Sequence, residues 1–218
     1  MEKQNKWKIV YFIILMFVSH IIFAEGNNSK HVLIVIGSVT ELLKNEDGTV
    51  DSVTSATKYM HGSAGESTME IGIRMKTYLT DKNFYADVIR SEDPAPELSD
   101  YDLIIIGSSI EGGIPKASVK TFIDTHREKL SEMNVAVFAS CGGLTSRHKG
   151  TRERSLLFAD RVSNGLNPVS KTVFEGENPD MGFWLNLLSW NVVLGTKTGD
   201  RRNWEAVEKW TLSLLEYK

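Results

Sequence analysis

The sequence predicts a three-layer α/β sandwich around a five-stranded, parallel, doubly wound sheet, and three observations predict it. Continuous apolar runs that end in glycine or serine recur along the chain, which is typical of strands buried on both faces. Amphipathic stretches of 12–15 residues lie between these runs. The length of 218 residues, with 41% hydrophobic and 24% charged residues, suits one globular domain with appendages. Alternating strands and helices form right-handed βαβ units and therefore a parallel sheet.

Five segments are predicted to be strands. The three clearest are the apolar runs at residues 31–37, 101–107 and 134–140. Residues 86–90 and 171–174 are shorter and carry polar residues, so they are the weaker candidates.

Four segments are predicted to be helices, because their apolar residues recur at helical spacing: residues 68–79, 116–130, 151–164 and 203–215. The third helix is expected to have Leu156, Leu157, Ala159 and Val162 as its apolar residues and to end at Gly165 as its C-cap. The fourth is expected to begin with Asn203 as its N-cap.

The N-terminal segment is predicted to lie outside the fold. Three lysines precede position 9, an apolar run follows at residues 9–24, and a polar segment comes next, which is typical of a secretory signal peptide. An uncleaved membrane anchor is the alternative, although the run is shorter than the about 20 residues that a spanning helix needs. We therefore expect an exported protein, periplasmic or extracellular, with a linker at 25–30 and a folded domain at 31–218.

Charge and cysteine content exclude several classes of protein. The net charge is −3, and removal of residues 1–24 leaves 22 basic and 27 acidic residues, a net charge of −5. We therefore expect no nucleic-acid binding. The single cysteine, Cys141, excludes an intramolecular disulfide and any multi-cysteine metal site. The histidines and carboxylates show no ligand spacing, so no metal site is expected.

Small residues follow three of the predicted strands, at residues 37–38, 107–113 and 140–143. Parallel α/β sheets bind ligands beyond the carboxyl ends of their strands. Glycine after a single strand is also the usual residue of a tight turn. Three such loops at one edge favour a ligand site.

A second polar loop precedes the first predicted helix. The first strand is not followed by G-x-G-x-x-G, and the chain has no Walker A loop. Instead, residues 55–68 are rich in Ser, Thr and Gly and lead into a helix, which is typical of an anion site because backbone N–H groups and the helix dipole point at the ligand. The alternative is a surface loop in which Ser67 or Thr68 caps the helix.

Three segments carry a resemblance to a known family. They are the strand VLIVIGS with Thr57-Lys58-Tyr59 and the later residues 67–71, the middle segment YDLIIIGSSIEGGIPKASVKTFI, and the tail from Val173 to Trp210. Together they resemble the flavodoxin family, and within it the flavodoxin-type, quinone-dependent protoporphyrinogen oxidases. The resemblance covers residues 30 to 215. It implies strand order 2-1-3-4-5, insertions at 39–56 and 176–202, and FMN as the cofactor.

The resemblance also implies which residues hold FMN. Those for the phosphate are Thr57, Ser63, Gly65, Ser67 and Thr68. Those for one side of the flavin ring are Ser109, Ile110, Glu111, Gly112 and Gly113, and those for the other side are Ser140, Cys141, Gly142 and Gly143. Tyr59 stacks on the ring or, alternatively, covers the sheet edge.

Two further features of the sequence bear on chemistry. Cys141 is reactive only if its pKa is depressed, for example by His148; the alternative, a small buried residue near the ligand, is favoured. The apolar, aromatic segment 183–194 either packs on the sheet or contacts a membrane surface or a quinone, and it is too short to span a bilayer. No catalytic residue is assigned.

Three functions are consistent with these features. The first is an FMN-dependent oxidoreductase that passes electrons from a reduced donor to a quinone-like acceptor or another small redox partner. The second is a simple one-electron carrier. The third is an exported binding module that keeps the fold and has lost FMN, since fold alone does not determine function.

Overall fold

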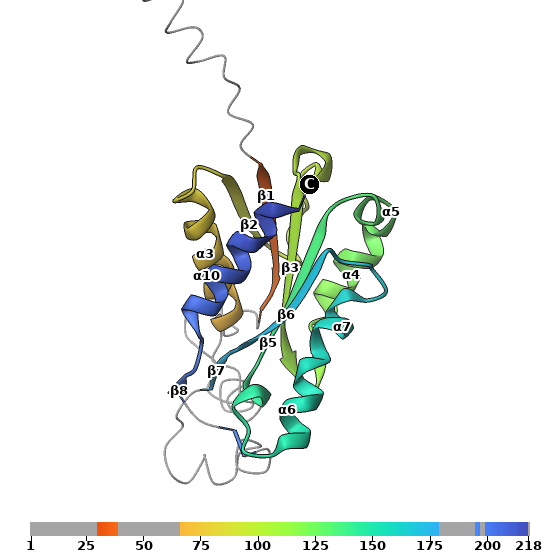
Figure 1. The fold of residues 1–218 in the computed structure, drawn as a ribbon. Coiled ribbons are helices and arrows are strands. Elements are labelled where there is room, and N and C mark those ends of the chain that lie inside the picture. Colours follow the sequence, from red (N-terminus) through yellow and green to blue (C-terminus); the bar gives the residue numbers. More distant parts are fainter. Residues whose placement is uncertain (1–29, 39–65, 179–194, 197–198, 218) are drawn as a thin grey trace, which may run out of the picture.

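Five parallel strands form the centre of the fold in the order β2-β1-β3-β5-β6 (Figure 1). Their bounds are β1 His31–Gly37, β2 Tyr85–Arg90, β3 Leu103–Glu111, β5 Val135–Cys141 and β6 Ser170–Glu175. The computed structural model describes residues 30–38, 66–178, 195–196 and 199–217. Counting only the parallel strands, this order is 2-1-3-4-5, so the predicted doubly wound topology is confirmed.

Helices cover both faces of the sheet. Figure 1 shows α3 (Ser67–Thr80) and α10 (Trp204–Ser213) on one face and α4 (Ala117–Thr125), α5 (Arg127–Ser131) and α7 (Phe158–Ser163) on the other. The remaining helix, α6 (Lys149–Leu156), lies at the end of the sheet where the strands finish. Three 3-10 helices complete the helical elements of the described ranges: η1 Leu98–Asp100, η2 Gly142–Thr145 and η3 Leu214–Glu216.

The core is divided between the two faces because side chains alternate along each strand. From β1, Val32, Ile34 and Ile36 pack with residues of α3 and α10, whereas Leu33 and Val35 pack with residues of α4 and α7. Full burial of each such side chain stabilises the fold by about 1.5–3 kcal/mol. The unbroken apolar run in the sequence therefore reflects a strand that is buried on both faces.

An aromatic cluster fills the α10 face beside β3. The Phe138 ring lies 5.5 Å from that of Phe174 and 6.2 Å from that of Trp210, between ring centroids. Gly107 gives Phe138 its space, because a Cβ at Gly107 would lie 2.2 Å from Phe138 Cζ. The glycine at this position is therefore required by packing.

Strand β3 is longer than the sequence predicts. It continues four residues past Gly107 to Glu111, because Ser108 and Ser109 still pair with β5 and residues 110–111 pair with the short antiparallel strand β4 (Ile114–Pro115). Ser109, Ile110 and Glu111 therefore belong to a strand and its hairpin, and their prediction as loop residues is wrong.

Two predicted helices are each divided in two. The helix predicted at 116–130 breaks at His126, whose φ and ψ of −108° and 15° are not helical, and the one predicted at 151–164 breaks at Leu157. Of the four apolar residues predicted for the second of these helices, Ala159 and Val162 are buried, whereas Leu156 and Leu157 are 61% and 55% exposed. They lie at the end of α6, beyond the sheet face that α7 covers through Ala159 and Val162.

The helix caps agree in part with those that the sequence predicts. The Asn203 side chain accepts a hydrogen bond from Ala206 N at 3.0 Å, which confirms it as the N-cap of α10. The C-cap of α7 is Asn164, with φ of 46°, and Gly165 follows with φ of 84°. Asparagine tolerates the left-handed conformation, so the cap falls one residue before the predicted glycine.

The insertion predicted at 176–202 begins and ends in a small ribbon, in which β7 (Glu177–Asn178) pairs with β8 (Gly199–Asp200). The insertion predicted at 39–56, the signal segment 1–24 and the apolar segment 183–194 lie outside the described residues. Within the described ranges, no helix is long and apolar enough to cross a membrane.

Replacement of Gly107 by alanine tests the packing of the aromatic cluster. We expect Gly107→Ala to lower the free energy of unfolding by about 1–3 kcal/mol, because Phe138 must leave its position. Urea unfolding followed by circular dichroism measures this change.

Gly150→Ala is the matched control. Gly150 lies in α6, and a Cβ there meets no atom within 4 Å. Alanine favours a helix by up to about 1 kcal/mol over glycine, so stability should be unchanged or slightly raised. Equal losses in the two variants would contradict the packing argument.

Candidate functional site

The predicted site residues that the structure describes gather at the carboxyl edge of the sheet. They are Ser67 and Thr68 at the start of α3, Ser109–Gly113 at the end of β3, and Ser140–Gly143 at the end of β5. Strands β3 and β5 are neighbours, so the two groups predicted to flank the flavin ring lie on adjacent strands as expected. Thr57, Tyr59, Ser63 and Gly65 lie outside the described residues.

Two buried serines face the same side of the sheet at this edge. The register places Ser109 opposite Ser140, on the face that α3 and α10 cover, and both are almost fully buried. Within the described part of the chain, the Ser109 hydroxyl has no hydrogen-bond partner. A buried hydroxyl without a partner is costly, so Ser109 points to a group that completes its hydrogen bonding.

The start of α3 lies close to these serines. A Cβ on Gly176 would lie 3.1 Å from Ser140 Oγ and 3.7 Å from Ser67 Oγ, so both hydroxyls lie around this glycine. Ser67 Oγ accepts a hydrogen bond from Glu177 N at 3.3 Å. The start of α3 and the end of β5 therefore both contact the segment that follows β6.

Within the residues that the structure describes, no side chain caps the amino end of α3. The N-cap position is Glu66, whose side chain makes no capping hydrogen bond, and Thr68 is buried. The alternative in which Ser67 or Thr68 caps this helix is therefore wrong. The first N–H groups of a helix have no intrahelical acceptor, and such groups are suited to binding an anion.

The acidic residues beside the helix start are paired with arginines. Glu66 pairs with Arg90, and Glu70 pairs with Arg202. Each of the two carboxylates therefore has a cationic partner. The N–H groups at the helix start and the serine hydroxyls, all neutral donors, fit the phosphate of FMN, the cofactor that the resemblance implies.

The end of β3 is a rigid hairpin. Gly112 and Gly113 form its two-residue turn with φ of 57° and 85°, which side-chain-bearing residues rarely adopt. An ion pair of 2.9 Å joins Glu111 to Lys116, and Arg161 donates a hydrogen bond to the Gly113 carbonyl. This hairpin therefore offers fixed backbone groups at the edge of the site.

The end of β5 places Cys141 in a buried environment. Burial raises the pKa of the Cys141 thiol above its ordinary value, and hydrogen bonds from the Gly143 and Leu144 backbone oppose this only in part. A raised pKa leaves little thiolate, so Cys141 is unsuited to nucleophilic chemistry. Gly143 is required here, because a Cβ would lie 2.1 Å from Ser155 Oγ.

Arg202 is a central residue of the site that the sequence analysis did not single out. Its guanidinium binds Asp200 through two contacts of 2.7 and 2.8 Å, pairs with Glu70 and Glu177, and donates to the Ser67 carbonyl at 3.3 Å. It lies 4.6 Å from the centre of the Trp204 ring, and its side chain is only 6% exposed. The signal in the sequence was the run Gly-Asp-Arg-Arg-Asn-Trp, which contains Asp200, but Glu70 and Ser67 lie more than 100 residues away along the chain.

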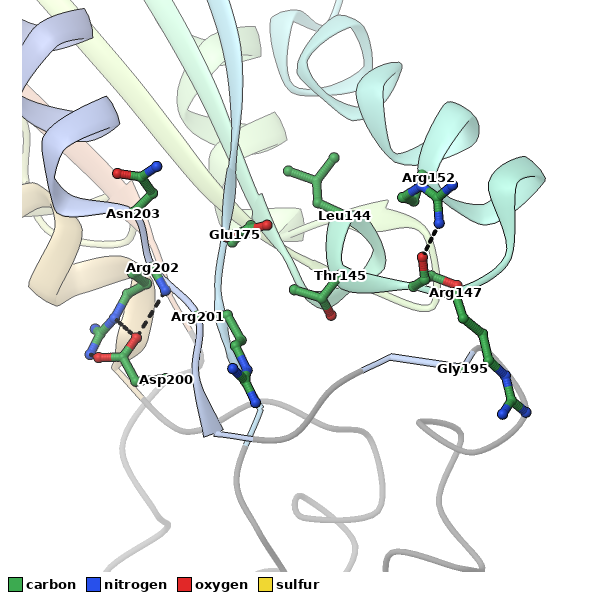
Figure 2. A pocket seen from close by; sticks show the side chains of 11 residues that line it. Leu144, Thr145, Arg147, Arg152, Glu175, Gly195, Asp200, Arg201, Arg202 and Asn203 are labelled. Atoms are coloured by element: carbon green, nitrogen blue, oxygen red, sulfur yellow. Dashed lines mark hydrogen bonds and ion pairs between the residues drawn. The ribbon is translucent and has the colours of Figure 1, made fainter.

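A pocket of about 930 Å³ opens beside the end of β5 (Figure 2). Its walls come from η2, the start of α6, the end of β6 and residues 200–203. Four arginines line it: Arg147, Arg152, Arg201 and Arg202. Within the described ranges, no group of three or more His, Cys, Asp or Glu side chains could hold a metal ion.

Replacement of Arg202 tests its role as a clamp. The hydrogen bond from Arg202 lowers the pKa of Asp200. The stabilisation that this pair gives is therefore complete above the ordinary carboxyl pKa, and it is lost as the pH falls through the lowered pKa of Asp200. We expect Arg202→Met to lower the free energy of unfolding by about 1–2 kcal/mol at pH 7. The difference from the unmodified chain should shrink between pH 5 and pH 3, measured by urea unfolding at each pH.

Lys149→Met is the control for the loss of a surface charge. Lys149 pairs with Glu153 at 3.6 Å, and both side chains are largely exposed. Such pairs contribute at most about 0.5 kcal/mol, so stability should barely change at any pH. A difference for Arg202→Met that stays constant from pH 7 to pH 3 would contradict the clamp.

This chain is similar to several solved structures. They include oxidised flavodoxin 1 from Bacillus cereus, with 18% identity over 87% of this chain and 99% of that chain and a TM-score of 0.48. A flavodoxin from Streptococcus pneumoniae has 17% identity over 85% and 97%, with a TM-score of 0.45. A flavoprotein in complex with FMN from Lactobacillus acidophilus has 15% identity over 66% and 93%, with a TM-score of 0.42.

A family model, rather than any single related protein, identifies the family of this chain. No curated protein sequence matches the chain significantly. The flavodoxin-domain model matches residues 60–196, which is more than half of the chain and contains β2, β3, β5, β6 and the helices between them. This chain therefore belongs to the flavodoxin-domain family.

Proposed function

We propose that this protein binds FMN at the carboxyl edge of its sheet and transfers electrons through it. Membership of the flavodoxin-domain family supports the cofactor and the electron-transfer role. The observation that carries the proposal is the buried Ser109 hydroxyl, which lacks a partner in the described part of the chain and lies opposite Ser140 near the uncapped start of α3.

The residues of this chain bind, orient and enclose the cofactor. FMN, when bound, supplies the redox chemistry, and the protein sets its position and electronic surroundings. The α3 N–H groups and Ser67 would hold the phosphate end, and Ser109, the β3–β4 hairpin and the loop at 140–143 would flank the ring. The raised pKa of the Cys141 thiol keeps it neutral, so it adds no charge beside the flavin.

We propose further that the electron acceptor is quinone-like, as in the flavodoxin-type protoporphyrinogen oxidases. The resemblance of residues 101–123 and 173–210 to that branch supports this. Ile114 also supports it: this apolar side chain is 68% exposed in the hairpin that would flank the ring. An apolar acceptor would gain contact area there.

The location of the protein is a separate proposal. The basic start and the apolar run of residues 1–24 support export to the periplasm or the outside of the cell, with cleavage after Ala24 or retention as an anchor. N-terminal sequencing of the protein purified from its own cells distinguishes the two. Contact of the segment 183–194 with a membrane is proposed on its composition alone.

The absorbance spectrum tests the cofactor and the reaction. We expect the purified full-length chain to be yellow, with flavin absorbance that acid precipitation releases as FMN. Once reduced, the protein should be reoxidised catalytically by a soluble quinone. Colourless protein that also fails to bind added FMN would overturn the proposal and leave an exported binding module. Bound FMN without quinone turnover would leave a one-electron carrier.

Ser109→Ala tests the observation that carries the proposal. Its hydroxyl has no partner in the described structure, so the free energy of unfolding of the FMN-free protein should stay within about 0.5 kcal/mol. Loss of a hydrogen bond to the cofactor should raise the Kd for FMN roughly threefold to tenfold. Fluorescence titration of FMN measures the affinity.

Ser108→Ala is the matched control on the neighbouring residue. The Ser108 hydroxyl accepts a hydrogen bond from Lys116 N and donates one to Ser109 O, both 2.9 Å long. Its loss should lower stability by about 1 kcal/mol and leave FMN affinity largely unchanged. The reverse pattern in the two variants would show that Ser109 does not face the cofactor.

A further inference from the structure

The arginine-lined pocket lies outside the residues assigned to FMN. Its walls begin at Leu144, after the loop at 140–143, and continue through α6 and residues 200–203. None of Ser67, Ser109 or the β3–β4 hairpin lines it. Its volume of about 930 Å³ lies within the range of small-molecule sites, about 300–1,000 Å³.

The charge of the lining is positive. Among the described residues that line the pocket, four arginines face two carboxylates, Glu175 and Asp200, which gives this part of the lining a net charge of +2. Arg202 binds Asp200 and also pairs with Glu70 and Glu177 outside the lining, so three carboxylates share its single charge. The other charged residues of the described lining are Arg147, Arg152, Arg201 and Glu175.

Arg152 is held in place without loss of its charge. Its Nη1 donates a hydrogen bond to the Ser146 carbonyl, a neutral acceptor, and Ser146 is itself buried. Figure 2 shows this contact on one wall of the pocket and the Arg201 side chain between that wall and the Arg202–Asp200 pair. A fixed guanidinium is a suitable partner for a carboxylate or phosphoryl group because its planar donors match either one.

Other lining residues also favour a polar ligand. Among the lining residues that the structure describes, Leu144 is the one large apolar side chain. The Asn203 side-chain oxygen accepts the Ala206 N–H, which leaves the amide NH₂ of Asn203 as a further donor. Hydrogen-bond donors and positive charge thus dominate the pocket.

We propose that this pocket is a second binding site, separate from the FMN site, for a small molecule that carries a carboxylate or phosphoryl group. Arg152 and Arg201 bind the anionic group. Arg202 holds the opposite wall in place and contributes little charge, since its carboxylate partners balance it. The site stands whether or not FMN binds, because it shares none of the residues assigned to FMN.

Isothermal titration calorimetry on the purified full-length chain tests the site. Inorganic phosphate and citrate are the two probes, each at constant ionic strength and each with FMN-free and FMN-saturated protein. We expect at least one probe to bind with a stoichiometry of one, and FMN to change its Kd by less than about twofold. Binding of phosphate assigns a phosphoryl ligand, binding of citrate a carboxylate, and binding of both supports the shared anion chemistry.

Variants locate the binding. Arg152→Gln and, independently, Arg201→Gln should each raise the Kd about tenfold or more, as expected for loss of a charge-assisted contact. Arg154→Gln is the matched control, because Arg154 lies on the same helix α6 and does not line the pocket. Its Kd should change by less than about twofold. Circular dichroism checks that each variant is folded.

Three results would overturn the proposal. The first is that neither probe binds the unmodified chain. The second is that Arg154→Gln weakens binding as much as the pocket variants do, which would show a general surface field. The third is that FMN saturation abolishes anion binding, which would make the pocket part of the FMN site.

Discussion

The burial of the central strands on both faces is the constraint on which the rest of the structure depends. Strands β1, β3 and β5 carry apolar side chains on each face, and the core on either side is closed by helices. Polar groups are therefore confined to the strand ends. From β1 the chain proceeds through α3 to β2, and from β3 through α4 and α5 to β5 on the opposite side. This reversal opens the sheet at the carboxyl edge, where Ser109 and Ser140 lie.

The insertion after β6 completes this edge. Arg202 connects the ribbon of β7 and β8 to the start of α3, through Glu177 and Asp200 on one side and Glu70 and the Ser67 carbonyl on the other. The partners are partly exposed, so each pair alone contributes little, but they share one almost fully buried guanidinium. The position of the insertion is thus coupled to that of the helix that is proposed to bind the phosphate.

The sequence predicts the strands better than it predicts the site. Long apolar runs identified β1, β3 and β5, because a strand that is buried on both faces has apolar residues at consecutive positions. The flavodoxin resemblance added the strand order. The hairpin at Gly112 and Gly113 was predicted as a loop, because its pairing partner is the two-residue strand β4. The helix breaks at His126 and Leu157 could not be predicted, because neither position is a glycine or a proline. Arg202 and the pocket depend on contacts between distant segments, which local spacing does not encode.

The edge of the sheet contains two different environments for an anion. Near the start of α3, the carboxylates are matched by arginines, and the donors that remain are backbone N–H groups and hydroxyls. Neutral donors bind a phosphate tightly only when several of them contact it at once, so such a site is specific for a ligand whose shape fits all of the donors. In the pocket, the guanidiniums of Arg152 and Arg201 attract any anion of suitable size, and their charge acts over a longer distance. A tightly held cofactor suits the first environment, and a ligand that enters and leaves suits the second.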